Sequence, residues 1–361
     1  MSKPRLIAFY LPQFYPTPEN DEWWEPGFTE WTNVAKAKPL FKGHYQPRIP
    51  QELGFYDLRV PETRERQAQL AREAGIEGFC YWHYWFAGRR LLDRVFREVV
   101  ESGKPDFPFC LCWANHDWQK KTWDQANSGK MLIEQTYPGR QDYIDHFYAM
   151  LPAFKDQRYI KLNGKLLYGI FAPLNMGLDN FVLFKTTWDK LSRENGLPGF
   201  TFMGLTSSIK YTSDISNMGF DCVVLDYLAE PFNQRKMAVN YFKRLRRTIF
   251  DIPDKVFNYS EYADKVTLSM KNADKVMPCV MPNFDHSPRS KERGFIFTGD
   301  CPEKWASLLY RTCKMCENRD PENNVIFIKA WNEWGEGNYL EPDRRFGRRF
   351  LDETRRVMDQ F

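Results

Sequence analysis

Eight short apolar runs, separated by segments with helical spacing, constrain the fold of this 361-residue chain more than any other feature. Runs without polar alternation are typical of strands that are covered on both faces of a parallel sheet. Strands are predicted at Leu6–Leu11, Ile76–Trp82, Phe107–Trp113, Lys165–Phe171, Thr201–Leu205, Cys222–Leu225, Met277–Met281 and Val325–Ala330.

The segments between these runs have the apolar spacing of amphipathic helices. Helices are predicted at Pro61–Ala74, Leu91–Ser102, Asp142–Lys155, Phe181–Glu194, around Val239–Phe250 and at Pro302–Glu317. Strands that alternate with helices in this way predict an α/β fold, a (β/α)8 TIM barrel with elaborated βα loops. No linker-like stretch divides the chain, so we expect a single domain over residues 1–361.

Composition and charge exclude several classes of function. The net charge of +4 is too small to argue for a nucleic-acid partner. No apolar run is long enough to insert into a membrane, and the N-terminus lacks the pattern of a signal peptide, so we expect a cytoplasmic protein. Five of the eight cysteines lie in apolar runs, which favours a reduced compartment. The oligomeric state is left open.

Polar and aromatic side chains gather at the ends of the predicted strands, where a TIM barrel carries its active site. Aromatic residues make up 16% of the chain, and their rings can stack on sugars, although most of them belong to the core. For a single residue such as His83, a purely structural role is equally open. Candidate substrate-binding residues are Tyr10, Gln13, Trp24, Trp31, Trp82, His83, Tyr84, Asn115, His116, Asp117, Asp226, Tyr227, Asp285, Arg289, Asn332 and Trp334.

The segment Trp331–Gly337 follows the eighth predicted strand and carries two carboxylates, Glu333 and Glu336. Apolar rings and partial burial raise a carboxyl pKa, so one glutamate can stay protonated while its neighbour is ionised. Cleavage of a glycosidic bond requires such a pair. The alternative is that both are solvated loop residues, but their position after a strand favours catalysis.

Metal and cofactor sites are not indicated by the spacing of the candidate ligands. His83, His116 and His286 lie on different loops, and none belongs to an H-x-H or H-x-x-x-H pair. Cys313 and Cys316 form a C-x-x-C without the second pair that a zinc site needs. We therefore expect no metal and no cofactor.

Four segments of the chain resemble the WbsX-type proteins: YLPQFYPTPENDEWWEPGFTEW, CWANHDW, FDHSPR and WNEWGEG with the LEP that follows it. These proteins are related to the family-99 glycoside hydrolases, which are endo-acting α-mannosidases and α-mannanases. The resemblance runs nearly end to end and implies a (β/α)8 barrel. It also implies that Glu336 is the general acid/base and that Glu333 is a base on the sugar 2-hydroxyl. The reaction would then retain configuration through a 1,2-anhydro sugar.

Two positions depart from the family pattern. His116 stands where the WbsX-type motif has Glu after W-A-N, and Gly335 stands where the mannosidases have His. The resemblance therefore does not extend to specificity for α-mannosides.

Three functions stay open. The first is a retaining glycoside hydrolase on a bacterial oligo- or polysaccharide, with the choice between endo-acting and exo-acting cleavage left open. The second is a glycosyltransferase of surface polysaccharide (O-antigen-type) synthesis, the role commonly assigned to WbsX-type proteins. The chain has no D-x-D and no glycine-rich phosphate loop, which disfavours a transferase. The third is a carbohydrate-binding barrel without activity, against which the intact glutamate pair argues.

The hydrolase hypothesis makes three structural predictions. Glu336 should have the raised pKa of the pair. Carboxyl groups about 5–5.5 Å apart would fit a double displacement and about 6.5–9.5 Å inversion, whereas the neighbouring-hydroxyl route needs neither. Some tryptophans of the first and third loops should be exposed in the cleft, and the candidates are Trp24, Trp31, Trp113 and Trp118.

Overall fold

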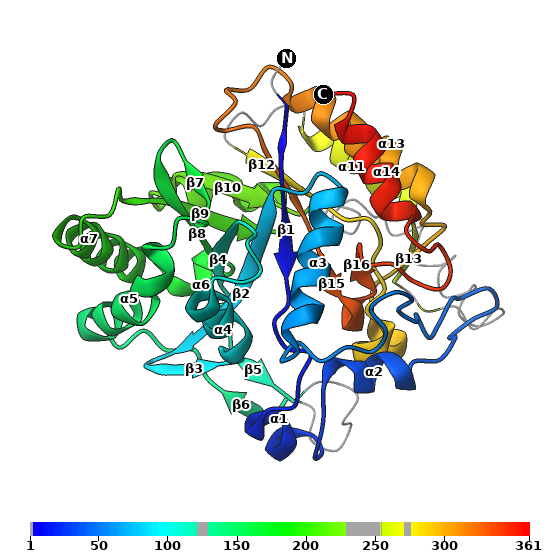
Figure 1. Ribbon diagram of the computed structural model, residues 1–361, viewed down its shortest axis with the longest axis horizontal. Helices are drawn as coiled ribbons and strands as arrows, with labels where there is room; N and C mark the ends of the chain where they lie inside the picture. Colours follow the sequence, from blue (N-terminus) through cyan, green and yellow to red (C-terminus); the bar gives the residue numbers. More distant parts are fainter. Residues whose placement is uncertain (1–2, 121–128, 229–252, 254, 271–275) are drawn as a thin grey trace.

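The computed structural model (Figure 1) describes residues 3–120, 129–228, 253, 255–270 and 276–361. Eight parallel strands form a closed barrel in the order β1-β14-β12-β10-β9-β8-β4-β2, and β2 pairs back to β1. Ile7 of β1 lies opposite Phe327 on one side and Gly78 on the other. The strands are β1 (Arg5–Tyr10), β2 (Gly78–Phe86), β4 (Phe109–Trp113), β8 (Lys165–Ile170), β9 (Phe200–Thr206), β10 (Cys222–Leu225), β12 (Val276–Val280) and β14 (Val325–Ile328).

This barrel confirms the predicted fold class, and each strand coincides with one of the apolar runs. The largest difference is in β2, which was expected to end at Trp82 but continues to Phe86 and pairs with β3 (Arg89–Leu91). Side chains alternate along a strand, so Trp82 and Tyr84 share one face of β2 and His83 lies on the other.

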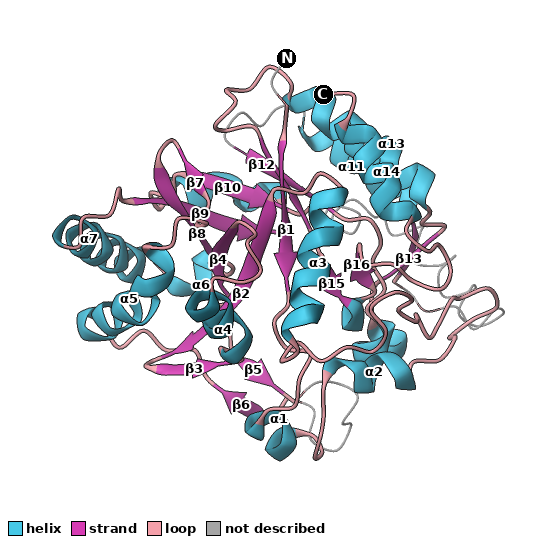
Figure 2. Ribbon diagram, viewed as in Figure 1, coloured by secondary structure: helices cyan, strands magenta, loops and turns pink. Residues whose placement is uncertain are grey.

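Helices cover the outside of the barrel (Figure 2). Five of them match predicted segments, and Pro61 begins α3 (Pro61–Glu73) as expected. The helix α14 (Arg349–Met358) packs against α13 (Pro302–Cys316) and α3. The helix predicted around Val239–Phe250 lies outside the described residues. The matching helices are α3 (Pro61–Glu73), α4 (Arg94–Ser102), α5 (Arg140–Phe154), α7 (Leu178–Glu194) and α13 (Pro302–Cys316), and α11 (Tyr259–Met270) was not predicted.

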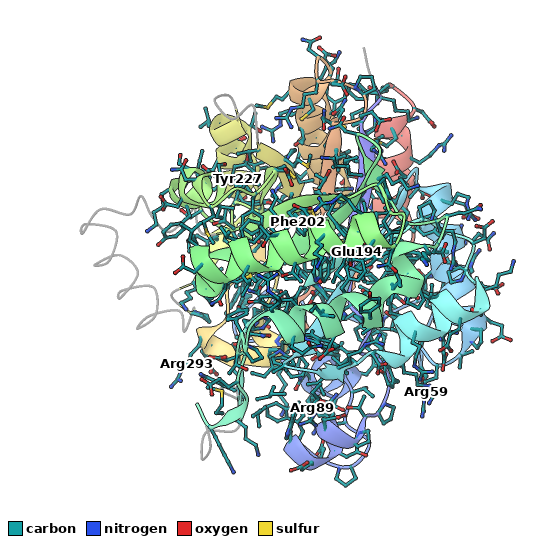
Figure 3. The ribbon with its side chains drawn as sticks, turned by 90° about the vertical axis from the view of Figure 1, so that its left-hand side faces the viewer. Arg59, Arg89, Glu194, Phe202, Tyr227 and Arg293 are labelled. Carbon is teal, nitrogen blue, oxygen red and sulfur yellow. The ribbon has the colours of Figure 1, made fainter. Side chains whose placement is uncertain are left out.

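A cluster of aromatic rings fills the space between the barrel and helices α5 and α7. Figure 3 shows α7 across the near face of the molecule, with Glu194 at its end and Phe202 of β9 beside it. Trp188 is fully buried, with ring-centre distances of 4.8 Å to Tyr168 and 5.2 Å to Phe200. Much of the aromatic content is therefore core, as expected.

The loops after the strands carry short elements of their own. In Figure 1, β1 points towards the end of the barrel where α1, α2, β5 and β6 lie, and the labelled chain ends lie at the opposite end. These elements are α1 (Pro18–Trp23) and α2 (Glu30–Lys36) after β1, β5 (Trp118–Gln119) and β6 (Met131–Ile133) after β4, α12 (Ser287–Ser290) and β13 (Ile296–Thr298) after β12, and β15 (Asn332–Glu333) and β16 (Asn338–Tyr339) after β14.

The remaining described elements are β7 (Lys161–Leu162), α6 (Pro173–Met176), α8 (Thr212–Asn217), β11 (Val256–Asn258) and the 3-10 turns Ile209–Tyr211, Lys291–Arg293 and Trp334–Glu336. Within the described part of the chain, no helix combines the length and apolarity needed to cross a membrane.

Candidate active site

A cavity of about 370 Å³ lies at the carboxyl ends of the barrel strands. Its walls come from the loop after β1, from β2, from the loop after β4 and from the segment after β14. The lining residues are Leu11, Gln13, Asn20, Trp23, Trp24, Phe28, Glu30, Trp82, Tyr84, Ala114, His116, Asp117, Trp118, Gln119, Leu132, Phe171, Arg289, Lys329, Glu333 and Glu336.

Both glutamates of the C-terminal motif line this cavity. Glu333 ends the short strand β15, and Trp82 Nε1 donates to its Oε1 at 2.7 Å. Glu336 follows in a 3-10 turn, and its side chain is more exposed, 18% against 6% for Glu333. The pair is therefore arranged with one carboxylate deep in the cavity and one closer to solvent.

Arg289 joins three carboxylates at the cavity floor. Its Nη1 donates to Glu336 Oε1 at 2.6 Å and its Nε to Glu30 Oε2 at 2.9 Å. Its Nη2 lies 3.7 Å from Glu333 Oε2. These carboxylates raise the pKa of Arg289 although its burial acts in the opposite direction. The guanidinium is therefore a permanent positive charge shared among three acids.

The pKa of Glu333 is raised to about 7, chiefly by burial and then by the charge of Glu336. Arg289, Lys329 and the hydrogen bond from Trp82 act in the opposite direction but do not cancel these effects. A raised pKa was predicted for Glu336 and stays a prediction there; the pKa of Glu333 is raised because this carboxyl is the more deeply buried of the two. A carboxyl with a pKa near neutrality can give or take a proton at neutral pH.

Lys329 is the second cation of the cavity. It lies at the end of β14 with 12% of its side chain exposed, and its Nζ is 3.4 Å from Asp226 Oδ2. The pKa of Lys329 is raised by Asp226, Glu336 and Glu333 against the effect of burial. Among the described lining residues, four are carboxylates, namely Glu30, Asp117, Glu333 and Glu336, and two are cations, Arg289 and Lys329. Acidic groups therefore outnumber cations among the described lining residues.

Gly335 is required by the packing of Glu30 and Arg289. A Cβ at position 335 would overlap Oε2 of Glu30 and lie 2.8 Å from Nε of Arg289. The space that a side chain at this position would need is thus filled by the Glu30–Arg289 ion pair. The glycine that departs from the mannosidase pattern therefore belongs to the same local arrangement as Glu30.

A buried polar network lies next to the segment Trp331–Gly337, which carries the two glutamates, and this network contains four of the predicted substrate-binding residues. At its centre, Glu341 accepts hydrogen bonds from Trp334 Nε1 at 2.6 Å, Gln67 Nε2 at 2.6 Å and Tyr56 OH at 2.9 Å. Burial raises the pKa of Glu341 to about 7. None of the four lines the cavity; they are Tyr10, Trp31, Asn332 and Trp334.

The contacts of these residues show what they do instead. Tyr10 OH donates to Gln67 at 2.7 Å, and Trp31 Nε1 donates to the carbonyl of Tyr56 at 2.7 Å. Asn332 accepts from the backbone N–H of Leu11 at 2.7 Å and donates to its carbonyl at 3.0 Å. Because side chains alternate along β15, Glu333 faces the cavity while its neighbour Asn332 fastens the strand to the end of β1.

Five further candidates also lie outside the cavity lining. His83 is on the opposite face of β2 from Trp82, with its Nε2 2.8 Å from that of His146. Asn115 fixes the end of β8, because its Oδ1 accepts from the backbone N–H of Ala172 at 2.7 Å. The other three are Asp226, Tyr227 and Asp285. Asp226 contacts Lys329, and Tyr227 is only 1% exposed.

Asp285 is fully buried, with its carboxylate turned away from the cavity. His44 Nε2 lies 2.8 Å from Oδ2 of Asp285, and Gln46 Nε2 donates to the same atom at 2.7 Å. The backbone N–H of Asp285 donates to the carbonyl of Glu336 at 2.7 Å. Asp285 therefore holds the turn that carries Glu336, and a direct contact with substrate is not supported.

Seven predicted substrate-binding residues do line the cavity together with the glutamate pair. They are Gln13, Trp24, Trp82, Tyr84, His116, Asp117 and Arg289. Of the four tryptophans expected in the cleft, Trp24 and Trp118 are partly exposed there, whereas Trp31 and Trp113 are buried.

Sequence reasoning missed Glu30 and Lys329. Glu30 lies inside the tryptophan-rich loop that the resemblance rests on, and Lys329 is a lone charge at the end of an apolar strand. The sequence signal that could have identified both residues is a charged side chain next to tryptophans or directly after an apolar strand.

No group of three or more His, Cys, Asp or Glu side chains suited to a metal ion occurs among the described residues. Cys313 and Cys316 are free thiols buried in α13.

Two solved structures with a similar fold are described as a glycoside hydrolase or as resembling one. A glycoside hydrolase-like protein aligns with a TM-score of 0.61 and 12% identity, over 99% of this chain and 94% of its own. The family-99 endo-α-mannosidase of Bacteroides thetaiotaomicron, in complex with bis-tris propane, aligns with a TM-score of 0.53 and 16% identity, over 99% and 97%. At these identities the likeness shows the fold alone.

Sequence relatives are much closer. A protein described as uncharacterized protein WxcX, from two strains of Xanthomonas campestris pv. campestris, is 35% identical over 356 residues. The match covers 98% of this chain, which spans about half the length of these curated relatives. Residues 6–354 match the family described as Glycosyltransferase WbsX. The chain therefore belongs to the WbsX family.

Proposed function

We propose that this chain is a glycoside hydrolase that cleaves an oligo- or polysaccharide with Glu333 and Glu336. The observation that carries the proposal is the pair itself. Two carboxylates share Arg289 at the floor of one cavity, and the pKa of Glu333 is raised to about 7. Acid and base groups at a glycosidic bond need such unequal environments. The fold shared with glycoside hydrolases agrees with this assignment.

The proposed roles follow the exposure of the two groups. Glu336, the more exposed carboxyl, protonates the leaving oxygen and later activates water. Glu333, deeper and oriented by Trp82, takes the proton of the sugar 2-hydroxyl, so that the hydroxyl oxygen attacks the anomeric carbon. Because the two carboxyls interact, their proton belongs to the pair, and the form that reacts has this proton on Glu336 and leaves Glu333 ionised as the base. The product would retain the anomeric configuration.

The cavity walls also suit a sugar. Trp24 and Trp118 are partly exposed on its side, and Gln13, His116 and Asp117 offer polar atoms beside them. Apolar faces with a few placed polar groups are the usual composition of a small-molecule site. We therefore expect the rings to contact the C–H faces of sugar units next to the bond that is cleaved.

A glycosyltransferase is the second candidate, because the description of the family names that activity. A nucleotide-sugar donor brings a diphosphate, which needs cations, a metal ion or a helix N-terminus. In the described lining, Arg289 is paired with Glu30 and Glu336, and Lys329 with Asp226. Carboxylates outnumber cations there, so the described part of the cavity would repel a diphosphate. This charge balance favours the hydrolase.

The test compares the wild-type protein with Glu336→Gln on a panel of bacterial polysaccharide fragments. We expect new reducing ends with wild type and almost none with the variant, and chromatography of the products separates endo from exo cleavage. Proton NMR of the first product should show the anomer of the substrate. Donor-dependent thermal stabilisation by a nucleotide sugar, together with no cleavage of any fragment, would instead establish the transferase.

A further inference from the structure

Glu30 is a charged residue of the cavity, and the proposed reaction gives it no role. It is the first residue of α2, which is capped by Thr29 and packs against the 3-10 turn that carries Glu336. Its side chain is only 10% exposed. A buried carboxylate costs free energy unless it is paired, so its position calls for a specific partner.

That partner is the guanidinium that also contacts the catalytic pair. Arg289 donates to Glu30 through Nε at 2.9 Å and to Glu336 through Nη1 at 2.6 Å. A contact of this kind favours the ionised carboxylate, whereas the proposed acid has to carry a proton when the glycosidic bond breaks. Some group must therefore balance the charge of Arg289.

We propose that Glu30 is a positioning residue that holds Arg289 and offsets its charge, so that the pair Glu333 and Glu336 retains one proton at neutral pH. Gly335 belongs to the same arrangement of side chains, because any side chain at position 335 would displace the Glu30 carboxylate from Arg289. The role in catalysis rests on the proposed hydrolysis, but the effect of Glu30 on the protonation of the pair can be measured without substrate.

Other charged and titratable groups face the pair and must be separated from this effect. Lys329 approaches from β14 with Asp226 behind it, and His286 Nε2 lies 3.7 Å from Glu336 Oε1. Among the described residues, these groups are Glu30 from α2, Tyr84 from β2, His116 and Asp117 after β4, Asp226 after β10, His286 and Arg289 after β12, and Lys329 at the end of β14.

The experiment follows the carboxyl carbons of the two glutamates by NMR in protein labelled with ¹³C at glutamate Cδ. The signals are assigned with Glu333→Gln and Glu336→Gln, and a carboxyl signal is distinct from the titration of an imidazole. Glu30→Gln keeps the shape and removes the charge, so the apparent pKa of Glu333 should fall by about one unit. Glu30→Asp withdraws the charge by one methylene and should give a smaller shift in the same direction.

Glu98→Gln is the matched control, because Glu98 pairs with the buried Arg64 outside the cavity lining. It should leave the titration of the pair unchanged. An identical titration in Glu30→Gln, Glu30→Asp and the control would overturn the proposal and reduce Glu30 to a structural ion pair.

The pH dependence of hydrolysis connects this titration to activity. The alkaline limb of the wild-type profile should move to lower pH in Glu30→Gln, by the same amount as the NMR titration. If the titration shifts but the wild-type protein cleaves no fragment at any pH, the proposed hydrolysis is wrong and the role of Glu30 in the charge balance stands. An alkaline limb that does not move although the titration does would overturn the catalytic part of the inference.

Discussion

Glu333 and Glu341 are eight positions apart in one segment, both are buried, and the pKa of each is raised to about 7. Their surroundings differ completely. Glu333 lines the cavity beside Arg289, Lys329 and a second carboxylate. Glu341 lies behind the motif and accepts hydrogen bonds from three neutral donors. The same pKa thus arises in a candidate catalytic group and in a packing group.

The difference shows which observation indicates function. Burial alone raises the pKa of a carboxyl, so a raised value is equally compatible with either role. Access to a cavity and the presence of charged partners are what distinguish Glu333. Changes in the cavity should therefore reduce activity at constant stability, and changes in the network around Glu341 should do the reverse.

The largest expected effect is the loss of activity in Glu336→Gln. Loss of a general acid lowers turnover about 10²- to 10⁴-fold for a substrate with a poor leaving group. An activated aryl glycoside needs little protonation and should partly escape this loss, whereas Glu333→Gln should slow both substrates alike. Steady-state rates on the two substrates measure the contrast. Near-wild-type cleavage by both variants would refute the assigned roles.

The next effect concerns stability. Glu341→Gln places an amide among three donors and leaves at least one of them without an acceptor. We expect unfolding in urea to show a loss of about 1–3 kcal/mol. The folded variant should still hydrolyse substrate far better than Glu336→Gln does. Unchanged stability with abolished activity would mean that Glu341, and not only the cavity pair, takes part in the chemistry.

The pH dependence of stability sharpens the comparison. Glu341 binds its proton more tightly in the folded state, because its pKa is about 7 there against an ordinary 4.5. The stabilisation is fully present below pH 4.5 and is lost as the pH rises to 7, an effect of about 3 kcal/mol. The stability advantage of wild type over Glu341→Gln should therefore shrink from pH 4.5 to pH 7. A difference that is constant over this window would contradict the burial argument.

The smallest expected effect is the change of KM in Trp24→Ala, and a tryptophan of the aromatic core serves as its contrast. Trp24→Ala removes a ring from the cavity wall and should raise KM about fivefold, or about 1 kcal/mol, with little change in kcat. Trp188→Ala, in the aromatic core, should instead lower stability by about 3–5 kcal/mol. Kinetics and urea unfolding of both variants test this. An unaltered KM in Trp24→Ala would contradict the proposal that the Trp24 ring contacts the sugar.

Periodicity was a sufficient guide to the barrel. Each of the eight runs, from Leu6–Leu11 to Val325–Ala330, became a barrel strand, because burial on both faces demands continuous apolar sequence. Chain position after a strand was a weaker guide to the site. It led to Trp82, Tyr84 and Arg289, but also to His83, Asn332 and Asp285, which the structure turns away from the cavity.

The sequence by itself determined the barrel, the end of the barrel that carries the site, and the glutamate pair within it. Of two adjacent residues in a strand, such as Asn332 and Glu333, only one faces the cavity, and the tertiary structure alone decided which one. The reason is that a shift of one residue along the strand reverses the face of every side chain. It also decided the partners of Arg289, since Glu30, Arg289 and Glu336 lie far apart in the chain and meet only when the barrel closes. Protonation of Glu333 and Glu336 depends on these contacts between charged side chains, because charges interact through space and not along the sequence.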